Sequence, residues 1–166
     1  MIRRVAFKKA IVAGVLGAAA WEAFARALAL AGVRVFDLVR VLGTLVFEPT
    51  SFWFWWPAGL ALHAMVGAIW AIFYAYFFWS TLDVRPLLQG MVFSILPAFL
   101  AGTVMVPQLD LMHSSAQQSF GLFAWRLGLG GPLVIIIGHL IYGAVLGTLY
   151  VRPVGYPVGT RITLNV

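Results

Sequence analysis

The stretch PLVIIIGHLIYGAVLGTLY, from Pro132 to Tyr150, decides the fold class. It is a nearly uninterrupted apolar run that contains one imidazole, His139, set among glycines. An earlier run, Pro57–Trp79, has the same character and carries His63. A helix needs about 20 apolar residues to cross about 30 Å of hydrocarbon, and both runs satisfy that length. We therefore expect both to be transmembrane helices.

The composition of the whole chain agrees with a membrane location. Of the 166 residues, 63% are hydrophobic and only 10% are charged, which is outside the range of soluble domains. The chain has no cysteine, so disulfides, thiolate chemistry and iron–sulfur ligation are excluded. We expect an all-α integral membrane protein, a single domain with four transmembrane helices at about 5–31, 57–79, 86–106 and 132–151.

The two histidine-containing runs resemble each other. When they are aligned on the histidines, both read His-x3-Gly-Ala-x5-Tyr, at an offset of 76 residues. The paired positions are His63 and His139, Gly67 and Gly143, Ala68 and Ala144, and Tyr74 and Tyr150. The same offset pairs Lys9 with Arg85 and Gly14 with Gly90. The pattern predicts two parallel-repeat helical hairpins, at about 5–79 and 82–151, related by an axis along the membrane normal.

The distribution of basic residues predicts the orientation. Seven fall inside if the N-terminus is cytoplasmic and four fall on or toward the outer side. The seven are Arg3, Arg4, Lys8, Lys9, Arg85, Arg152 and Arg161; the four are Arg26, Arg34, Arg40 and Arg126. We expect both termini in the cytoplasm and the first helix to stay uncleaved. The net charge of +6 then serves orientation and contact with anionic lipids, and we expect no nucleic-acid partner.

Two segments between the first two spans are typical of the membrane interface. Polar residues recur every three or four positions from Arg34 to Thr44, with apolar residues between them, as in an amphipathic interfacial helix. An aromatic cluster follows, in which Trp53, Trp55 and Trp56 are the expected anchors at headgroup level. Tyr74 and Tyr150, at the inner ends of their spans, are further expected interface residues.

Ionisable residues inside a membrane are functional candidates because their burial in lipid is costly. Four qualify, namely Glu22, Arg26, His63 and His139, and all four fall near one layer in the outer half of the bilayer. Glu22 and Arg26 are spaced i, i+4, which favours an intramembrane ion pair. The alternative makes Glu22 a proton carrier or a ligand that faces the histidines.

The histidine pair admits three interpretations. Each imidazole could simply hydrogen-bond a neighbouring helix. His63 and His139 could instead be axial ligands of haem b, with Gly67 and Gly143 leaving room for the macrocycle. The third interpretation is a metal site in which Glu22 joins the two histidines. His113, in the polar stretch that we expect to form an outer loop from Gln108 to Arg126, is expected to be solvated.

Other features point to packing. Gly143-x3-Gly147 is a spacing that marks close helix contact in membranes, and Pro97 predicts a kink in the third span. No phosphate loop, nucleophile elbow or zinc-protease motif is present, so we expect no enzymatic activity.

The run Gly138–Tyr150 resembles the last helix of small bacterial four-helix membrane proteins of unknown function, and Leu62-His63-x3-Gly67 is similar to their second helix. The resemblance implies a bacterial inner-membrane location and a four-helix fold. It implies no activity and transfers no catalytic residue.

These observations lead to one functional prediction and two alternatives. We expect a non-catalytic accessory or structural subunit of a larger bioenergetic membrane complex, whose partners are the lipid bilayer and other membrane-protein subunits. The first alternative is an electron-transfer subunit that binds haem b through His63 and His139. The second is a small proton-coupled carrier that uses Glu22.

Overall fold

A computed structural model describes residues 5–79, 81–82, 84–112 and 119–150. Four of its helices are long and apolar enough to cross a membrane. The first is α1 (Phe7–Leu30), and the second joins α3 (Phe52–Phe73) to the π-helix η1 (Tyr74–Phe78). The third joins α4 (Pro86–Leu100), the π-helix η2 (Ala101–Met105) and α5 (Val106–Met112), and the fourth is α6 (Gly130–Leu149). The described residues contain no strand, so the predicted all-α, four-span fold of a multi-pass membrane protein is confirmed.

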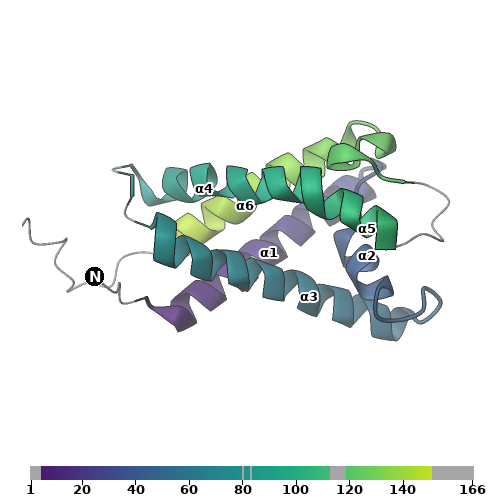
Figure 1. The fold of residues 1–166 in the computed structure, drawn as a ribbon, viewed down its shortest axis with the longest axis horizontal. Coiled ribbons are helices and arrows are strands. Elements are labelled where there is room, and N and C mark those ends of the chain that lie inside the picture. Colours follow the sequence, from purple (N-terminus) through teal and green to yellow (C-terminus); the bar gives the residue numbers. More distant parts are fainter. Residues whose placement is uncertain (1–4, 80, 83, 113–118, 151–166) are drawn as a thin grey trace, which may run out of the picture.

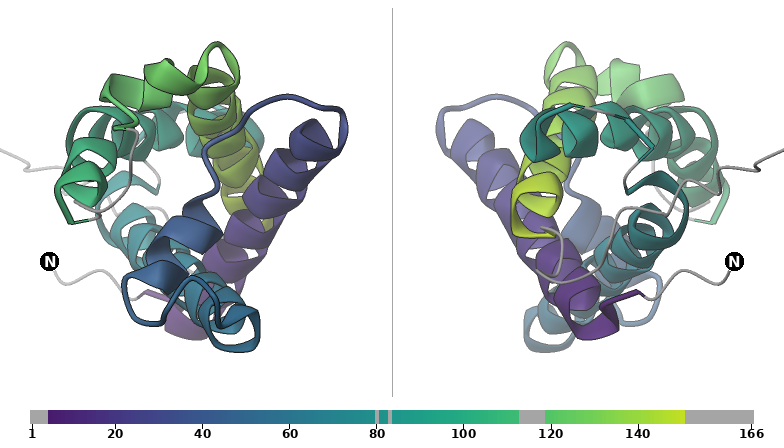
Figure 2. Two further views of the ribbon diagram at one scale, coloured as in Figure 1. Left: turned by 90° about the vertical axis from the view of Figure 1, so that its right-hand side faces the viewer. Right: turned by 90° about the vertical axis from the view of Figure 1, so that its left-hand side faces the viewer.

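The spans form a bundle in which the helices are arranged around a common long axis, as the end views in Figure 2 show. The start of α1 and the end of α6 lie at one end, which we call the terminal end (Figure 1). Two short helices, α2 (Leu38–Thr44) and the 3₁₀-helix η3 (Leu122–Leu127), lie at the other end, which we call the loop end. His113 and four of the basic residues used to predict the orientation, Arg3, Arg4, Arg152 and Arg161, lie outside the described residues.

The spans differ from their predicted limits in two places. The second begins five residues early, at Phe52, so the aromatic cluster is its first turns rather than a linker. Pro57 is tolerated there because it removes only one hydrogen bond close to the helix start. The third span continues to Met112, so the expected outer loop is helical in its first residues.

A glycine ends the first span. Gly32 has a φ of 83°, and the Val33 N–H donates to the carbonyl of Leu28 at 3.0 Å. This closes the helix with a left-handed residue, which glycine adopts without a steric penalty. The chain reverses after it and returns toward the bundle as an extended segment before α2.

Glycine contacts within the bundle follow the 76-residue offset. A methyl group added at Gly14 would overlap the carbonyl oxygen of Gly67, where α1 meets α3. One added at Gly90 would overlap the carbonyl oxygen of Gly143, where α4 meets α6. The two hairpins therefore pack through equivalent glycine pairs, the close approach that small residues allow in membranes.

The bundle departs from this two-fold relation at one interface. α1 crosses the bundle diagonally in Figure 1 and packs extensively on α6 as well as on α3. The equivalent partners α3 and α4 make little backbone contact. Their gap is closed near the terminal end by the rings of Trp70, Phe73, Tyr74 and Phe78 around Phe93, with ring centroids 5.0–6.3 Å apart. Toward the loop end this filling stops.

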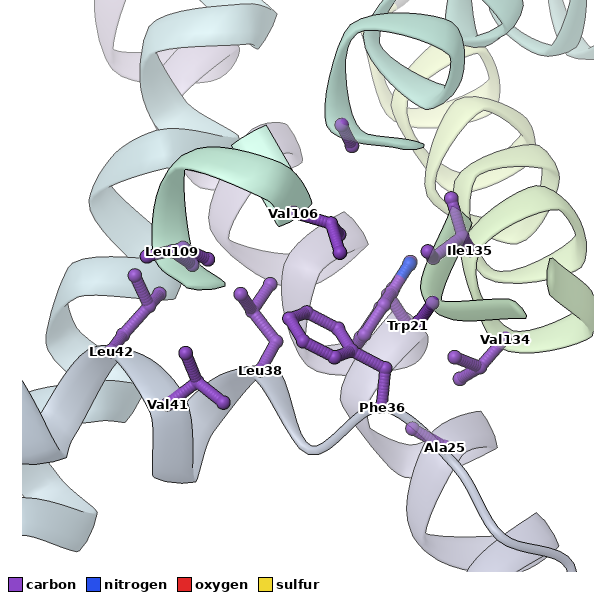
Figure 3. Packing of buried hydrophobic residues seen from close by; sticks show 12 residues of the cluster. Trp21, Ala25, Phe36, Leu38, Val41, Leu42, Val106, Leu109, Val134 and Ile135 are labelled. Atoms are coloured by element: carbon purple, nitrogen blue, oxygen red, sulfur yellow. The ribbon is translucent and has the colours of Figure 1, made fainter. Parts of the chain in front are cut away.

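The loop end has its own apolar core. Figure 3 shows Trp21 of α1 and Phe36 of the extended segment before α2 beside Val106, Val134 and Ile135 from the third and fourth spans. α2 adds buried residues from its apolar face, Leu38, Val41 and Leu42. The expected amphipathic segment is therefore a seven-residue helix packed on α3, which covers the core.

Two groups of expected interface residues need correction. Trp53 is 84% exposed and Trp56 is 40% exposed, as anchors should be, but Trp55 is buried with its backbone against Gly43. Tyr74 and Tyr150 are also buried, and their rings contact each other with centroids 6.1 Å apart. Trp55, Tyr74 and Tyr150 are core residues because each faces another helix.

Candidate functional site

A cavity of about 250 Å³ lies in the part of the α3–α4 gap that the aromatic rings do not fill. It contains both intramembrane histidines, so the structure brings together the two residues that the sequence singled out. Residues from six helices line it: Ala18, Trp21, Leu38, His63, Val66, Gly67, Trp70, Pro97, Leu100, Ala101, Val104, Met105, His139 and Tyr142. Most of this wall is apolar, and a few polar atoms project into it, which is typical of a ligand site.

His139 has a defined tautomer. Its Nδ1 lies 2.6 Å from the carbonyl oxygen of Ile135, one turn earlier in α6. A carbonyl oxygen can only accept, so the proton is on Nδ1, and Nε2 of the neutral ring is an acceptor. No further hydrogen bond to this ring comes from the described residues. The cavity therefore contains one free acceptor nitrogen.

His63, on α3, is the second polar group. Its side chain is buried, with 8% of the residue exposed, and it has no hydrogen bond within the part of the chain that the structure describes. A buried polar group without a partner is destabilising unless a ligand or water completes it. The predicted role of His63 as a residue that joins helices by a hydrogen bond has no support among the described contacts.

Trp21 lies beside both histidines. Its ring is edge-on to both, with centroid distances of 4.9 Å to His63 and 6.3 Å to His139. Its indole N–H is buried without a partner among the described residues. Gly138 makes room for this ring, because a methyl group at that position would overlap the indole nitrogen.

Tyr142 fastens α6 to α3 beside the cavity. Its hydroxyl donates to the carbonyl oxygen of Gly67 at 2.7 Å. The residue at the equivalent position of the other repeat is Val66, which has no hydroxyl. The bond therefore has no counterpart at the equivalent position of the other repeat, and it fixes one wall of the cavity.

The cavity reaches the lipid-facing surface. Val104 lines it and is 52% exposed, and Val66, Trp70 and Leu100 beside it are partly buried. The opening lies between α3 and the third span, where Pro97 and the wide turn of η2 interrupt the regular helix. Pro97 of α4 occupies the position equivalent to Trp21 of α1. The third span therefore has a proline, which disturbs helix geometry, where the first span has a large ring.

Glu22 and Arg26 form the predicted ion pair, with Arg26 Nε 2.6 Å from Glu22 Oε1. Arg26 also donates to both carboxylate oxygens of Asp37, at 3.1 and 2.9 Å. Asp37 in turn accepts the backbone N–H of Arg40 at 3.0 Å and caps α2. These contacts attach α2 to α1, and Arg26 is the partner that neutralises Glu22.

The metal interpretation is wrong for the described residues. No group of three His, Cys, Asp or Glu side chains in that part of the chain could hold a metal ion. Glu22 is bonded to Arg26 instead, four residues later on the same helix.

Haem b does not fit the cavity either. The cavity of about 250 Å³ is below the range of about 300–1,000 Å³ that is usual for sites of drug-sized ligands, and haem needs a site within that range. The positions expected to leave room for it are filled, Gly67 by α1 and Gly143 by α4.

Sequence reasoning missed two residues of this site. Trp21 is the only aromatic residue between Gly14 and Ala23, and Tyr142 places a phenol in the middle of a span. Each was a signal, because a large ring among small residues needs a dedicated space and a buried hydroxyl needs a partner.

Comparison with family models, with curated proteins and with solved structures found no match. The site therefore has to be interpreted from its own geometry.

Proposed function

We propose that this protein is a membrane-embedded binding protein that takes a small, mainly apolar molecule from the bilayer into the histidine cavity. The observation that carries the proposal is an apolar cavity, open toward lipid, in which the described contacts leave two imidazoles with unused hydrogen-bonding positions.

The size of the cavity supports a ligand with one ring. A dry engineered cavity of about 150 Å³ is enough to bind benzene, so about 250 Å³ accommodates a substituted benzene ring. A long chain attached to such a ring would pass between Val66 and Val104 into the lipid. Association from the bilayer needs no path through water.

The test uses dibromodurene, a tetramethylbenzene with two bromines, as a probe in lipid nanodiscs. Bromine quenches tryptophan fluorescence on contact, and Trp21 and Trp70 both line the cavity. We expect quenching that saturates and is reversed by unbrominated durene. Quenching that only increases linearly with the probe's share of the lipid would mean partitioning, and would overturn the proposal.

Cavity-filling variants provide the controls. Ala101 is buried and lines the cavity, so Ala101→Leu should abolish the saturable component. Ala61→Leu makes the same change on an exposed position of α3 and should leave it intact. Val66→Phe, at the partly buried rim, is a second blocking variant if Ala101→Leu unfolds.

The accessory-subunit prediction remains a second proposal and rests on the first turn of α3. Trp53 and Phe54 are 84% and 62% exposed there, which suits an interface with another membrane protein as well as with lipid. Co-purification from native membranes would support it if a defined partner is lost in Trp53→Ala but kept in Ile69→Ala, an exposed change elsewhere on α3. The proton-carrier alternative is not favoured, because Arg26 pairs with Glu22.

A further inference from the structure

The hydrogen-bonding state of the cavity points to a class of ligand. We infer that the cavity binds the reduced, dihydroxylated ring of a membrane quinol, in preference to the oxidised quinone. This inference rests on the proposed function, because it assumes that the cavity takes up a ring from the bilayer.

The first argument is the direction of the hydrogen bond at His139. Nδ1 carries the proton and donates it to Ile135, so Nε2 can only accept from a ligand. A quinol hydroxyl has a proton to donate to Nε2. A quinone carbonyl has none and would face the nitrogen lone pair, so the oxidised ring loses this bond.

The second argument is the position of the two imidazoles. His63 and His139 occupy equivalent places in the two hairpins, and both side chains line the same cavity. A ring with two polar groups at opposite positions can present one of them to each imidazole. A para-dihydroxylated ring has that form. His63 has no partner in the described chain and can accept from or donate to the second hydroxyl.

The third argument is the apolar surround. Pro97, Leu100, Ala101 and Val104 face the ring from the third span, and Trp21 and Trp70 add aromatic edges and faces. No acidic or basic side chain other than the imidazoles lines this space. A neutral, substituted ring suits it, whereas a charged phosphate headgroup would have no ion partner there. The opening toward lipid selects a ring on an apolar tail over a water-soluble phenol.

The experiment compares ligands of one shape that differ in their hydrogen-bonding groups. Duroquinol, its dimethyl ether, duroquinone and durene each displace dibromodurene from the wild-type protein in nanodiscs under argon. We expect duroquinol to bind about tenfold more tightly than the ether or the quinone, which is the effect of about one hydrogen bond to an otherwise unpaired nitrogen. His139→Phe, which keeps a ring but removes the acceptor, should make these three ligands equal without abolishing binding of durene.

The outcomes separate the two proposals. Equal affinity of quinol, ether and quinone for the wild-type protein would overturn the quinol assignment and leave an apolar ring site. Tighter binding of the quinone would also overturn it, because the inference rests on a hydroxyl proton that His139 Nε2 accepts. Failure of all four rings to displace the probe would overturn the proposed function as well. The wild-type comparison decides these questions even if His139→Phe does not fold.

Discussion

Arg26 connects two carboxylates that lie at different distances along the chain. Glu22 is four residues before it on the same helix face, and Asp37 is eleven residues after it, beyond the end of α1. The side chain of Glu22 is largely buried, and that of Asp37 is partly exposed. A buried carboxylate whose cation is removed becomes strongly destabilising. Arg26 therefore contributes to stability chiefly by neutralising Glu22.

Replacing Arg26 should lower the stability of the protein. We expect Arg26→Gln to decrease the free energy of unfolding by about 1–3 kcal/mol, below the usual cost of breaking a buried pair because the guanidinium is partly exposed. Thermal unfolding in detergent, followed by tryptophan fluorescence, measures the effect. Arg34→Gln, the same change at an exposed arginine, is the control and should have little effect.

The double variant Arg26→Gln, Glu22→Gln makes this test specific. Removing both charges leaves no buried anion, so the double variant should be more stable than Arg26→Gln alone. The opposite order would show that the ion pair itself is not what matters at this position.

At the residue scale the sequence predicts local contacts and misses distant ones. The Glu22–Arg26 pair follows from helix periodicity alone. The Asp37 contact depends on the reversal at Gly32, whose positive φ is not specified by the pattern of the flanking residues. In the same way, both histidines are recognisable as buried ionisable groups, but the Ile135 bond that fixes the tautomer of His139 is visible only in the structure.

At the scale of elements, paired glycines determine how the helices meet. Gly90 of α4 and Gly143 of α6 allow backbone contact, and Gly14 and Gly67 do the same between α1 and α3. In an isolated helix, replacing glycine with alanine stabilises by about 1 kcal/mol. Here the added methyl group would meet a backbone carbonyl that cannot move aside.

We therefore expect Gly90→Ala to destabilise the protein by about 1–3 kcal/mol, the usual range for overpacking, against its favourable helix propensity. Gly14→Ala should have the same sign, because it lies at the equivalent contact. Ile95→Val, a small change on the exposed face of α4, is the reference. Unfolding in a graded series of denaturing detergent gives the comparison, and stabilisation by both alanines would contradict the glycine packing.

The helices themselves were predictable because long apolar runs dominate the chain. Their irregular turns were not. Pro97 indicates a disturbance, but the π-turn appears four residues later, at Ala101–Met105, where it forms part of the cavity wall. The recurrence of polar residues every three or four positions predicts the short α2, but that pattern does not distinguish burial under lipid headgroups from burial against α3.

At the scale of the whole molecule, the orientation in the membrane stays a prediction from the basic residues. Lys8, Lys9 and Arg85 lie at the terminal end, and Arg26, Arg34, Arg40 and Arg126 lie toward the loop end. The excess of basic residues at the terminal end therefore depends on Arg3, Arg4, Arg152 and Arg161, which lie outside the described residues. Positive charge next to spans favours the cytoplasmic side. We expect the terminal end in the cytoplasm.

The absence of cysteine makes this orientation simple to test. Single cysteines can be introduced as Thr50→Cys, in the exposed segment before α3, and as Thr81→Cys, in the exposed connection between η1 and α4. A membrane-impermeant maleimide should label position 50 in intact cells and position 81 only after permeabilisation. The reverse pattern would place the terminal end outside.

The opening of the cavity between α3 and the third span has a consequence for how its affinity is expressed. A ligand that enters from lipid is counted by its mole fraction in the bilayer, because water is not the phase from which it arrives. Diluting proteoliposomes with buffer at constant lipid composition should therefore leave occupancy unchanged. Adding empty vesicles that exchange the ligand should lower it, and a dissociation constant quoted per litre of solution would change with every preparation.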